Sequence, residues 1–501
     1  MVRHQVLGRP LMSPTAVLFR RTRGLVRALF RAPGRPTGIL LATLSVGCAS
    51  ASNRGDFGAV ERLVGARTPL VVRWTSGTHE DSLVDERVRA VLRGEVTVDS
   101  AVQVALLRNR ALRATFEEVG LAQADVVQAS LLANPVFSGE VLGAGGGGRG
   151  VQLANVALPF VDALQRPLRR RIAASALVAT QQRVADAVMR VAAEVRIAYV
   201  EAQATEQSLE LWQRVVTVTD ASATAASAVH AAGNLSDLAL AEERAMAAES
   251  RLSLIRAEES RRVARAGLER LMGVAADSSW NVSPRLPDPG ADSLSLATLL
   301  RVAQARRLDL MARRQDIESV ARLLGFTRKF ALLADGTIGL GYEREPDGTF
   351  RGGGVNVPIP LFDRGQGRVA RARAQLRQAV AMHDALAVDI SAEVTSDFAR
   401  LSGARDRALQ LQRAVLPLRR AVVSEMQRFV NAMQETVFTL LLARQSEIDA
   451  GQAYVESLRE YWSTRAELER AVGGSFAPLS PAEQAAFSDR GASRSEMRDE
   501  P

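Results

Sequence analysis

The sequence predicts a mainly α-helical chain that also carries a small β portion and repeats one order of elements in its two halves. Aromatic residues make up only 5% of the 501 residues, and alanine is frequent over long stretches. Such a composition favours extended packing of helices over several globular cores. The third observation is the repetition itself, because each half contains a helix, a glycine-rich strand pair and then a very long helical region.

Each half opens with an amphipathic helix and continues with two strands. In the first half we expect the helix at 98–132 and the strand pair between Pro135 and Pro159. In the second half we expect the helix at 294–329 and the strand pair between Ala334 and Pro360.

The junctions between strand and long helix are alike in the two halves. Pro159-Phe-Val-Asp162 and Pro360-Leu-Phe-Asp363 lie 201 residues apart. Proline lacks the N–H that a strand ladder needs, and a carboxylate can accept hydrogen bonds from the free N–H groups of a first helical turn. We therefore expect Pro159 and Pro360 to close a strand, and Asp162 and Asp363 to open a helix.

A short polar turn divides each long helical region. Gly233-Asn-Leu-Ser236 corresponds to Met433-Gln-Glu-Thr436, with the Ser and Thr 200 residues apart. From Leu164 to about Ser227 the only proline is Pro167, which a first helical turn tolerates. At about 1.5 Å per residue this helix would be on the order of 95 Å long, so it must pack against neighbours along its whole length. Helical periodicity alone leaves a soluble coiled coil as an alternative.

The second strand pair alternates apolar residues with polar or small ones. Ile338, Leu340 and Tyr342 share one side, as do Val355, Val357 and Ile359, whereas the first pair alternates less evenly. Strands of about 9–11 residues with one apolar face suit a membrane barrel. Two strand pairs in one chain cannot close a barrel without leaving unpaired edges in lipid, so the chain must associate with copies of itself. Two copies would supply eight strands and three would supply twelve.

Residues 1–47 are typical of a signal peptide. They contain eight arginines and no acidic residue, and the apolar run Gly38–Gly47 ends at Cys48, the only cysteine. Small residues before Cys48 resemble a bacterial lipobox, although Ser45 stands where leucine is usual. We therefore expect the thiol to carry lipid, each buried CH₂ of which contributes about 0.8 kcal/mol. A single cysteine excludes an internal disulfide and a CxxC site.

The formal net charge of +9 does not indicate a nucleic-acid partner, because without the eight arginines of the first 47 residues the chain carries only +1. His4, His79, His230 and His383 form no HxxxH or HExxH pair, so we expect no zinc site. The chain also lacks a Walker or GxSxG motif. We expect no catalytic residue, no metal and no cofactor.

From Thr97 to Gly474 the chain resembles the TolC-like outer-membrane factor family. The resemblance is carried by the duplicated plan, by Leu132–Pro135 before the first hairpin, by Pro358-Ile-Pro-Leu-Phe-Asp-Arg-Gly-Gln-Gly367 and by the turn at Gly233. The second of these stretches is the most specific, and it is similar to the heavy-metal-cation efflux branch.

The resemblance implies a homotrimer whose twelve-stranded transmembrane β-barrel lies in the bacterial outer membrane and continues as an α-helical periplasmic tunnel. It also implies a passive export duct for drugs or heavy-metal cations, working with a periplasmic adaptor protein and an inner-membrane pump. A periplasmic coiled-coil scaffold or an adaptor of the same kind of system is the alternative. Each helical tip is a short turn without room for a lipoyl-like domain, which disfavours an adaptor.

The resemblance places the turns at Gly233 and Met433 at the periplasmic tip, where a constriction closes the tunnel. Family members often have acidic residues six and nine positions after the second tip glycine, but here those places hold Thr439 and Leu442, and Met433 replaces the glycine. The candidate tip and constriction residues are His230, Gly233, Ser236, Asp237, Glu435 and Thr436. For Asp237 and Glu435 we favour stabilisation of a helix N-terminus, worth about 0.3–1 kcal/mol, over a charge filter.

The sequence thus divides into six parts. They are a signal peptide at 1–47, a lipidated N-terminal segment at 48–96, a first repeat at 97–275, a linker at 276–293, a second repeat at 294–474 and a polar, disordered tail at 475–501.

Overall fold

The computed structural model describes residues 57–74, 85–86, 88–143, 151–274, 280–290, 294–333, 335–345, 347–474 and 476. The chain divides into two units, Met1–Ser52 and Asn53–Pro501, and every described residue belongs to the second. The expected signal peptide, Cys48 and nearly all of the expected tail lie outside the described residues.

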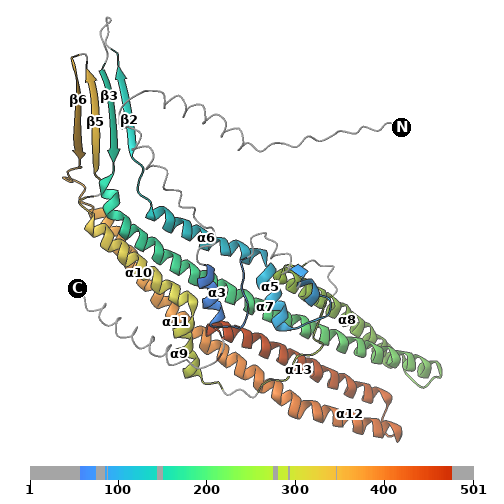
Figure 1. The fold of residues 1–501 in the computed structure, drawn as a ribbon. Coiled ribbons are helices and arrows are strands. Elements are labelled where there is room, and N and C mark those ends of the chain that lie inside the picture. Colours follow the sequence, from blue (N-terminus) through green and yellow to red (C-terminus); the bar gives the residue numbers. More distant parts are fainter. Residues whose placement is uncertain are drawn as a thin grey trace, which may run out of the picture. The chain divides into compact units, whose positions relative to one another are not determined.

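The described chain is mainly helical and repeats one order of elements, as the sequence predicts (Figure 1). The first repeat contains α5 (Val98–Arg108), α6 (Arg110–Ser130), β2 (Val136–Leu142), β3 (Val151–Leu158), α7 (Phe160–Ala231) and α8 (Asp237–Met272). The second contains α9 (Leu296–Arg306), α10 (Leu308–Lys329), β5 (Thr337–Glu345), β6 (Gly348–Asn356), α11 (Gln366–Gln410), a π-helical turn (Leu411–Val415), α12 (Leu416–Asn431) and α13 (Val437–Ala471). In this unit the sheet lies at one end and the α7–α8 and α12–α13 turns at the other.

The expected single helices at 98–132 and 294–329 are each two helices. The breaks fall at Asn109 and Arg307, which both adopt extended backbone conformations. Asn109 Oδ1 accepts a hydrogen bond from Leu112 N at 3.0 Å, and its Nδ2 donates to Leu271 O at 2.9 Å. The prediction was wrong because contacts with a distant helix end, which local periodicity does not contain, stabilise the break.

A glycine packs against each of these breaks. Gly273 and Gly473 have φ of +65° and +81°, a conformation that suits glycine. A Cβ at Gly273 would lie 2.6 Å from Arg108 O, and one at Gly473 would lie 2.9 Å from Arg306 C. The two repeats therefore use the same close backbone contact, 200 residues apart.

The strands form one antiparallel sheet in the order β2-β3-β5-β6. The pairing of β3 with β5 joins the two hairpins, with Val156 opposite Leu340. A separate two-residue parallel pair joins β1 (Glu95–Val96) to β4 (Asn281–Val282). These two short strands lie in the expected N-terminal segment at 48–96 and in the expected linker at 276–293, outside both repeats.

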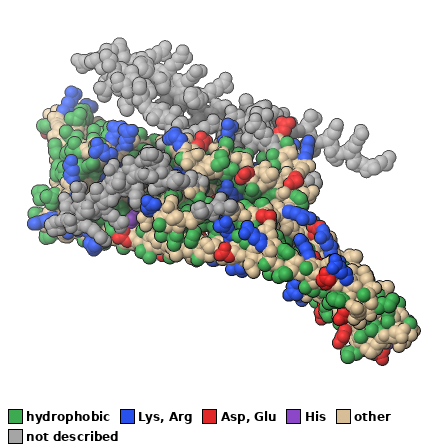
Figure 2. Space-filling model, turned by 90° about the horizontal axis from the view of Figure 1, so that it is seen from below, with side chains coloured by type: hydrophobic (Ala, Val, Ile, Leu, Met, Phe, Trp, Pro, Cys, Tyr) green, Lys and Arg blue, Asp and Glu red, His purple; other side chains and the backbone are tan. Residues whose placement is uncertain are grey.

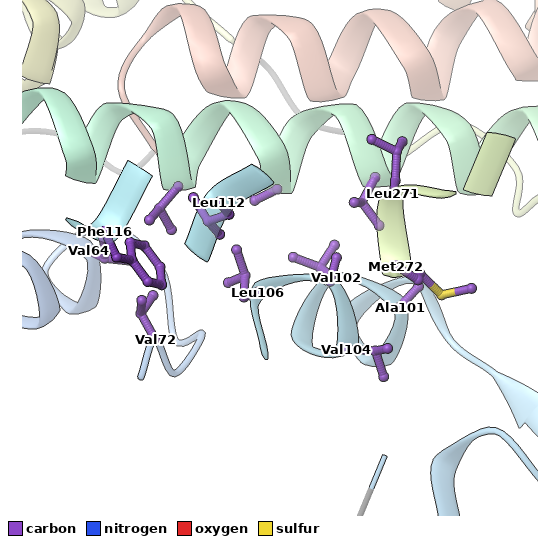
Figure 3. Close-up of a cluster of buried hydrophobic side chains, with 14 of the residues drawn as sticks. Val64, Val72, Ala101, Val102, Val104, Leu106, Leu112, Phe116, Leu271 and Met272 are labelled. Carbon is purple, nitrogen blue, oxygen red and sulfur yellow. The ribbon is translucent and has the colours of Figure 1, made fainter. Parts of the chain in front are cut away.

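The long helix α7 is the centre of the packing. It contacts α5, α6, α8, α10, α13 and the short helix α3 (Phe57–Gly65). Its buried face is rich in alanine and valine, including the fully buried Ala179, Ala185 and Val188, so neighbouring helices can approach closely. Figure 3 shows part of the largest apolar cluster among the described residues, to which Leu106, Leu112, Phe116, Leu271 and Met272 belong.

Across the described ranges, no helix combines enough length with enough apolar character to cross a bilayer.

Candidate functional site

The two helical tips have the same backbone geometry. Gly233 N donates to His230 O at 2.8 Å, and Met433 N donates to Val430 O at 3.0 Å. Both turn residues are left-handed, with φ of +75° at Gly233 and +54° at Met433. Met433 thus has the backbone conformation that glycine has at the other tip, and its side chain is 95% exposed.

The helices that leave the tips are capped by the two residues that the sequence aligns. Ser236 Oγ accepts from Ala239 N at 3.2 Å, and Thr436 Oγ1 accepts from Thr439 N at 3.3 Å. Each cap satisfies one N–H of a first helical turn that has no partner within the helix.

The charged tip residues are bound locally. His230 Nε2 lies 2.8 Å from Asp237 Oδ1, and Glu435 Oε2 accepts from Thr439 Oγ1 at 3.2 Å. Among the residues that the structure describes, no group of three or more His, Cys, Asp or Glu side chains is arranged to hold a metal ion. The structure thus brings His230 and Asp237 together at one turn and gives Glu435 a partner in the first turn of α13.

Pro159 lies between β3 and α7 as expected, but the junction carboxylates bind other groups than expected. Asp162 lies inside the first turn of α7, but its Oδ2 accepts from Ala133 N at 3.0 Å and its Oδ1 lies 2.5 Å from Arg169 Nη1. The carboxylate therefore fixes the segment between α6 and β2 to α7, and no side chain caps the helix that follows Pro159.

In the second half, β6 ends at Asn356, so Pro360 lies beyond the strand and does not close it. Asp363 Oδ1 accepts from Gly365 N at 2.8 Å, in the turn before α11. Gly365 itself is the residue before the helix, with φ of +78°. The expected capping of a first turn was wrong here too, because the carboxylate binds the preceding turn.

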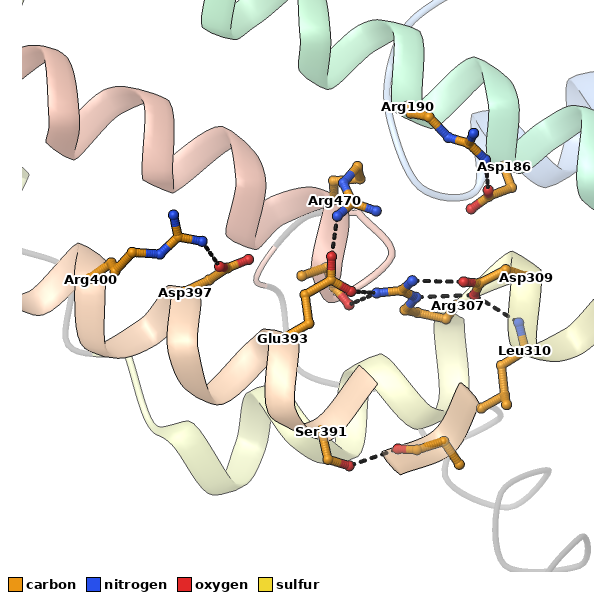
Figure 4. A network of polar contacts seen from close by, with 12 residues as sticks. Asp186, Arg190, Arg307, Asp309, Leu310, Ser391, Glu393, Asp397, Arg400 and Arg470 are labelled. Carbon is orange, nitrogen blue, oxygen red and sulfur yellow. Dashed lines mark hydrogen bonds and ion pairs between the residues drawn. The ribbon is translucent and has the colours of Figure 1, made fainter. Parts of the chain in front are cut away.

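A buried charge network at the α9–α10 break was not predicted from the sequence (Figure 4). The Arg307 side chain is only 8% exposed, and its Nη2 lies 2.7 Å from Asp309 Oδ2. Its Nη1 donates to Glu393 and, at 3.3 Å, to Ala471 O, while Glu393 also accepts from Arg470. Arg307 thus binds the end of α13 in the same way that Asn109 binds the end of α8. The sequence hint of this equivalence is that Arg307 lies 198 residues after Asn109, close to the spacing of the two repeats.

Burial and charge act in opposite directions on this network. Burial raises the pKa of Asp309, but its hydrogen bonds and the positive charge of Arg307 together outweigh burial. The pKa of Asp309 is therefore below its ordinary value. Burial lowers the pKa of Arg307, and its two carboxylate partners raise it well above its usual range. Arg307 and Asp309 are therefore both charged near neutral pH. The network links α9, α10, α11 and α13.

The helical run from α11 to α12 is interrupted by the π-helical turn at Leu411–Val415. Pro417 follows directly and lacks the N–H needed for a regular helical hydrogen bond. A π turn next to proline is a common cause of a local change in helix direction. The sequence predicts a long helical region divided only by the turn at Met433, and Pro417 is the visible clue to this second interruption.

One face of the sheet is apolar across all four strands. Residues paired directly across an antiparallel sheet lie on the same face, and the register brings together exposed apolar side chains from both hairpins. The large apolar side chains of this face are Phe137, Val141, Val156, Leu158, Ile338, Leu340, Tyr342 and Val355, and the polar Gln152, Arg344 and Arg351 lie on it toward the hairpin turns.

The other face of the sheet is mostly polar or small. Ser138, Asn155, Gly341 and Gly352 lie there. The large apolar side chains on this face are Val136, Leu142, Val151, Leu153 and Phe350. Within the described residues, β2 and β6 are the edges of this sheet. The described sheet therefore has one mainly apolar face, one mostly polar or small face and two unpaired edges.

Comparison with known proteins identifies similar chains. No protein-family model matches the sequence. The cobalt-zinc-cadmium resistance protein CzcC of Cupriavidus metallidurans is 26% identical over 333 residues, which are 65% of this chain and 77% of that protein. The CmeC outer membrane channel of Campylobacter jejuni aligns with a TM-score of 0.65 and 14% identity, over 78% of this chain and 88% of that one. The outer membrane protein VceC of Vibrio cholerae aligns with a TM-score of 0.62 and 18% identity, over 76% of this chain and 97% of that one.

Proposed function

We propose that this chain, which has the fold of the TolC-like outer-membrane channels, is the outer-membrane component of a tripartite efflux system. The observation that carries the proposal is the sheet, in which one apolar face runs across all four strands and two edges remain open. Such a sheet can satisfy its backbone groups in lipid only by pairing with further strands.

Three copies would place twelve strands in one barrel and would bring three sets of long helices together below it. The apolar face then contacts lipid, and the face with Gly341 and Gly352 lines the duct. Exposed apolar side chains on α12, among them Leu418, Val422 and Phe429, suit contacts between neighbouring copies along the helical part.

The chain acts as a passive duct in this proposal. We assign it no catalytic residue, so the energy for export comes from an inner-membrane pump, connected through a periplasmic adaptor protein. The turns at Gly233 and Met433 form the periplasmic tip, where the adaptor binds and where His230, Asp237 and Glu435 border the constriction. Heavy-metal cations are the cargo best supported, because the relative from Cupriavidus metallidurans is named for resistance to cobalt, zinc and cadmium.

Anchoring of the N-terminus in the outer membrane is part of the same proposal. Lipid on Cys48 would fix the first mature residue beside the barrel. Cys48→Ala should abolish incorporation of labelled fatty acid while the far-UV circular dichroism stays unchanged. Persistent labelling of the variant would exclude Cys48 as the acylated residue.

The main experiment combines mass measurement in detergent with single-channel recording in planar bilayers. We expect a particle of three chains and discrete conductance steps. A water-soluble monomer without conductance would instead support the coiled-coil scaffold. Cargo is tested in cells, where deletion of the gene should raise the accumulation of cobalt, zinc or cadmium, and unchanged accumulation would exclude these cations.

A further inference from the structure

Basic side chains are concentrated where the long helices meet the sheet. The Arg and Lys side chains of three segments together form what we call the basic collar. The segments are 166–171 on α7, 328–329 on α10 and 364–377 at the start of α11. Residues 160–171, 326–333 and 362–377 contain eleven basic and two acidic side chains, a net charge of +9. Because residues 48–501 together carry only +1, this concentration is a local feature of one end of the molecule.

Contacts between the helix ends hold the three segments together. Arg368 Nη2 donates to Ala331 O at 3.3 Å, which links the start of α11 to the end of α10. A Cβ at Gly336, just before β5, would lie 2.9 Å from Val161 on α7. The three basic segments therefore surround the same end of the sheet (Figure 1).

Much of the collar has no carboxylate partner. Arg371, Arg373 and Arg377 are exposed, and no ion pair is formed by them within the described part of the chain. Arg169 is neutralised by Asp162, whereas Arg166 donates to a backbone carbonyl, Ser130 O, at 2.5 Å. Such an excess of positive charge on a folded surface suits an anionic partner.

Exposed apolar side chains lie between the collar and the strands. The segment between β6 and α11 exposes Ile359, Leu361 and Phe362, the last of which is 91% exposed. Leu332, between α10 and β5, and Leu164, in the first turns of α7, are exposed as well. In Figure 2, green hydrophobic and blue basic side chains share the end of the molecule away from the helical tips, and few acidic side chains appear there.

This order along the molecule, from apolar strands to an apolar rim and then to arginine, matches the depth profile of a membrane surface. Apolar side chains enter the acyl region, and arginine side chains extend to the phosphate groups. A free anion would need the charges but not the exposed apolar rim. The rim therefore favours a lipid surface as the occupant.

We propose that the basic collar binds the headgroup phosphates of anionic phospholipids in the periplasmic leaflet of the outer membrane. The proposal rests on the proposed function, because only a sheet inserted in that membrane brings the collar to its periplasmic surface. The bound headgroups would neutralise the collar and fix the height of the barrel in the bilayer.

The test uses the purified full-length trimer in neutral detergent and measures its thermal unfolding midpoint. Dimyristoylphosphatidylglycerol should raise the midpoint more than dimyristoylphosphatidylcholine does, and added salt should reduce the difference. A variant with Arg368, Arg371, Arg373 and Arg377 all changed to Gln should lose more than half of this difference. The same four positions changed to Lys should keep most of it, because Lys retains the charge.

The matched control is Arg413→Gln with Arg419→Gln, which removes exposed charges far from the sheet and should leave the lipid effect unchanged. An equal response of the wild type to both lipids would overturn the proposal. So would an equal midpoint rise with inorganic phosphate, which would assign the collar to small anions. A Gln variant with altered ion selectivity and an intact lipid effect would place these arginines in the duct and would also overturn it. Wild-type conductance, recorded in parallel, shows separately whether the proposed channel function holds.

Discussion

The assignment of one sheet face to lipid and the other to the duct gives the sharpest prediction. Leu340 is the fourth of the nine residues of β5 and 73% exposed, and it lies on the apolar face beside Val156. In the proposed barrel, Leu340→Arg would place a cation near the middle of the lipid-facing wall. Gly352→Arg adds the same side chain to the opposite face, where a new Cβ would meet no atom within 4 Å.

The magnitude follows from depth. An arginine on the lipid face costs about 2–4 kcal/mol at the bilayer midplane and about 0–1 kcal/mol near the interface. For Leu340→Arg this corresponds to a factor of roughly 30 to 900 in the folding equilibrium of one subunit, and three substituted subunits would lose roughly 6–12 kcal/mol together. Leu158→Arg lies on the same face at the end of β3, so it should cost less than about 1 kcal/mol.

The assay is the fraction of chain recovered as a detergent-stable trimer after expression and mild extraction. We expect wild-type recovery for Gly352→Arg, a small loss for Leu158→Arg and a large loss for Leu340→Arg. If Gly352→Arg lost more trimer than Leu340→Arg, the assignment of the two faces would be reversed. Equal losses at Leu340 and Leu158 would refute the argument from depth.

Four further predictions concern the helical part. Arg307→Ala removes the arginine partner of the half-buried Asp309 and leaves Glu393 with Arg470 alone, so it should lower the free energy of unfolding by about 3 kcal/mol in denaturant titrations. A loss below about 1 kcal/mol would contradict a stabilising role of the buried guanidinium. Folding lowers the pKa of Asp309, so the ionised carboxylate stabilises the fold above its unfolded pKa of about 3.8, and this stabilisation is lost as the pH falls through the folded pKa. Asp309→Asn should therefore make the melting temperature depend less on pH in the acid range. Met433→Gly should stabilise the α12–α13 turn by about 1 kcal/mol, because its left-handed φ suits glycine, and a lower melting temperature would show that the Met side chain makes stabilising contacts. Asp237→Asn should leave single-channel cation conductance unchanged if the carboxylate only supports the turn with His230, whereas a changed conductance would assign it to a filter.

The elements that the sequence predicted well depend on local chemistry. The long proline-free helix α7, the capped turns at Ser236 and Thr436, and the order of helix, hairpin and long helix all follow from residues close together in the chain. Hydrogen bonds within a helix and caps at its end connect residues a few positions apart. For this reason periodicity, proline positions and the repeat spacing sufficed to predict them, whereas the TolC-like fold was implied by the family resemblance.

The tip residues illustrate the limit of a motif match. Gly233 and Met433 share one backbone conformation although only one of them is glycine, so the equivalence was visible in the spacing and not in residue type. The pairing of His230 with Asp237 depends on the turn that brings two helices together. Sequence alone located the tip, and the fold decided which of its charges meet.

The sequence by itself determined the helical architecture and the duplication, because these depend on local pattern. From the unpaired backbone groups of two strand pairs it also predicted association with further copies. The tertiary structure decided where Asn109 and Arg307 break their helices, and which carboxylates the buried arginine binds. It also decided that Phe137 and Val141 of the uneven first hairpin share a face with Leu340. These features join residues up to about 200 positions apart, and strand register or helix contact at such separation is set by packing that no local pattern contains.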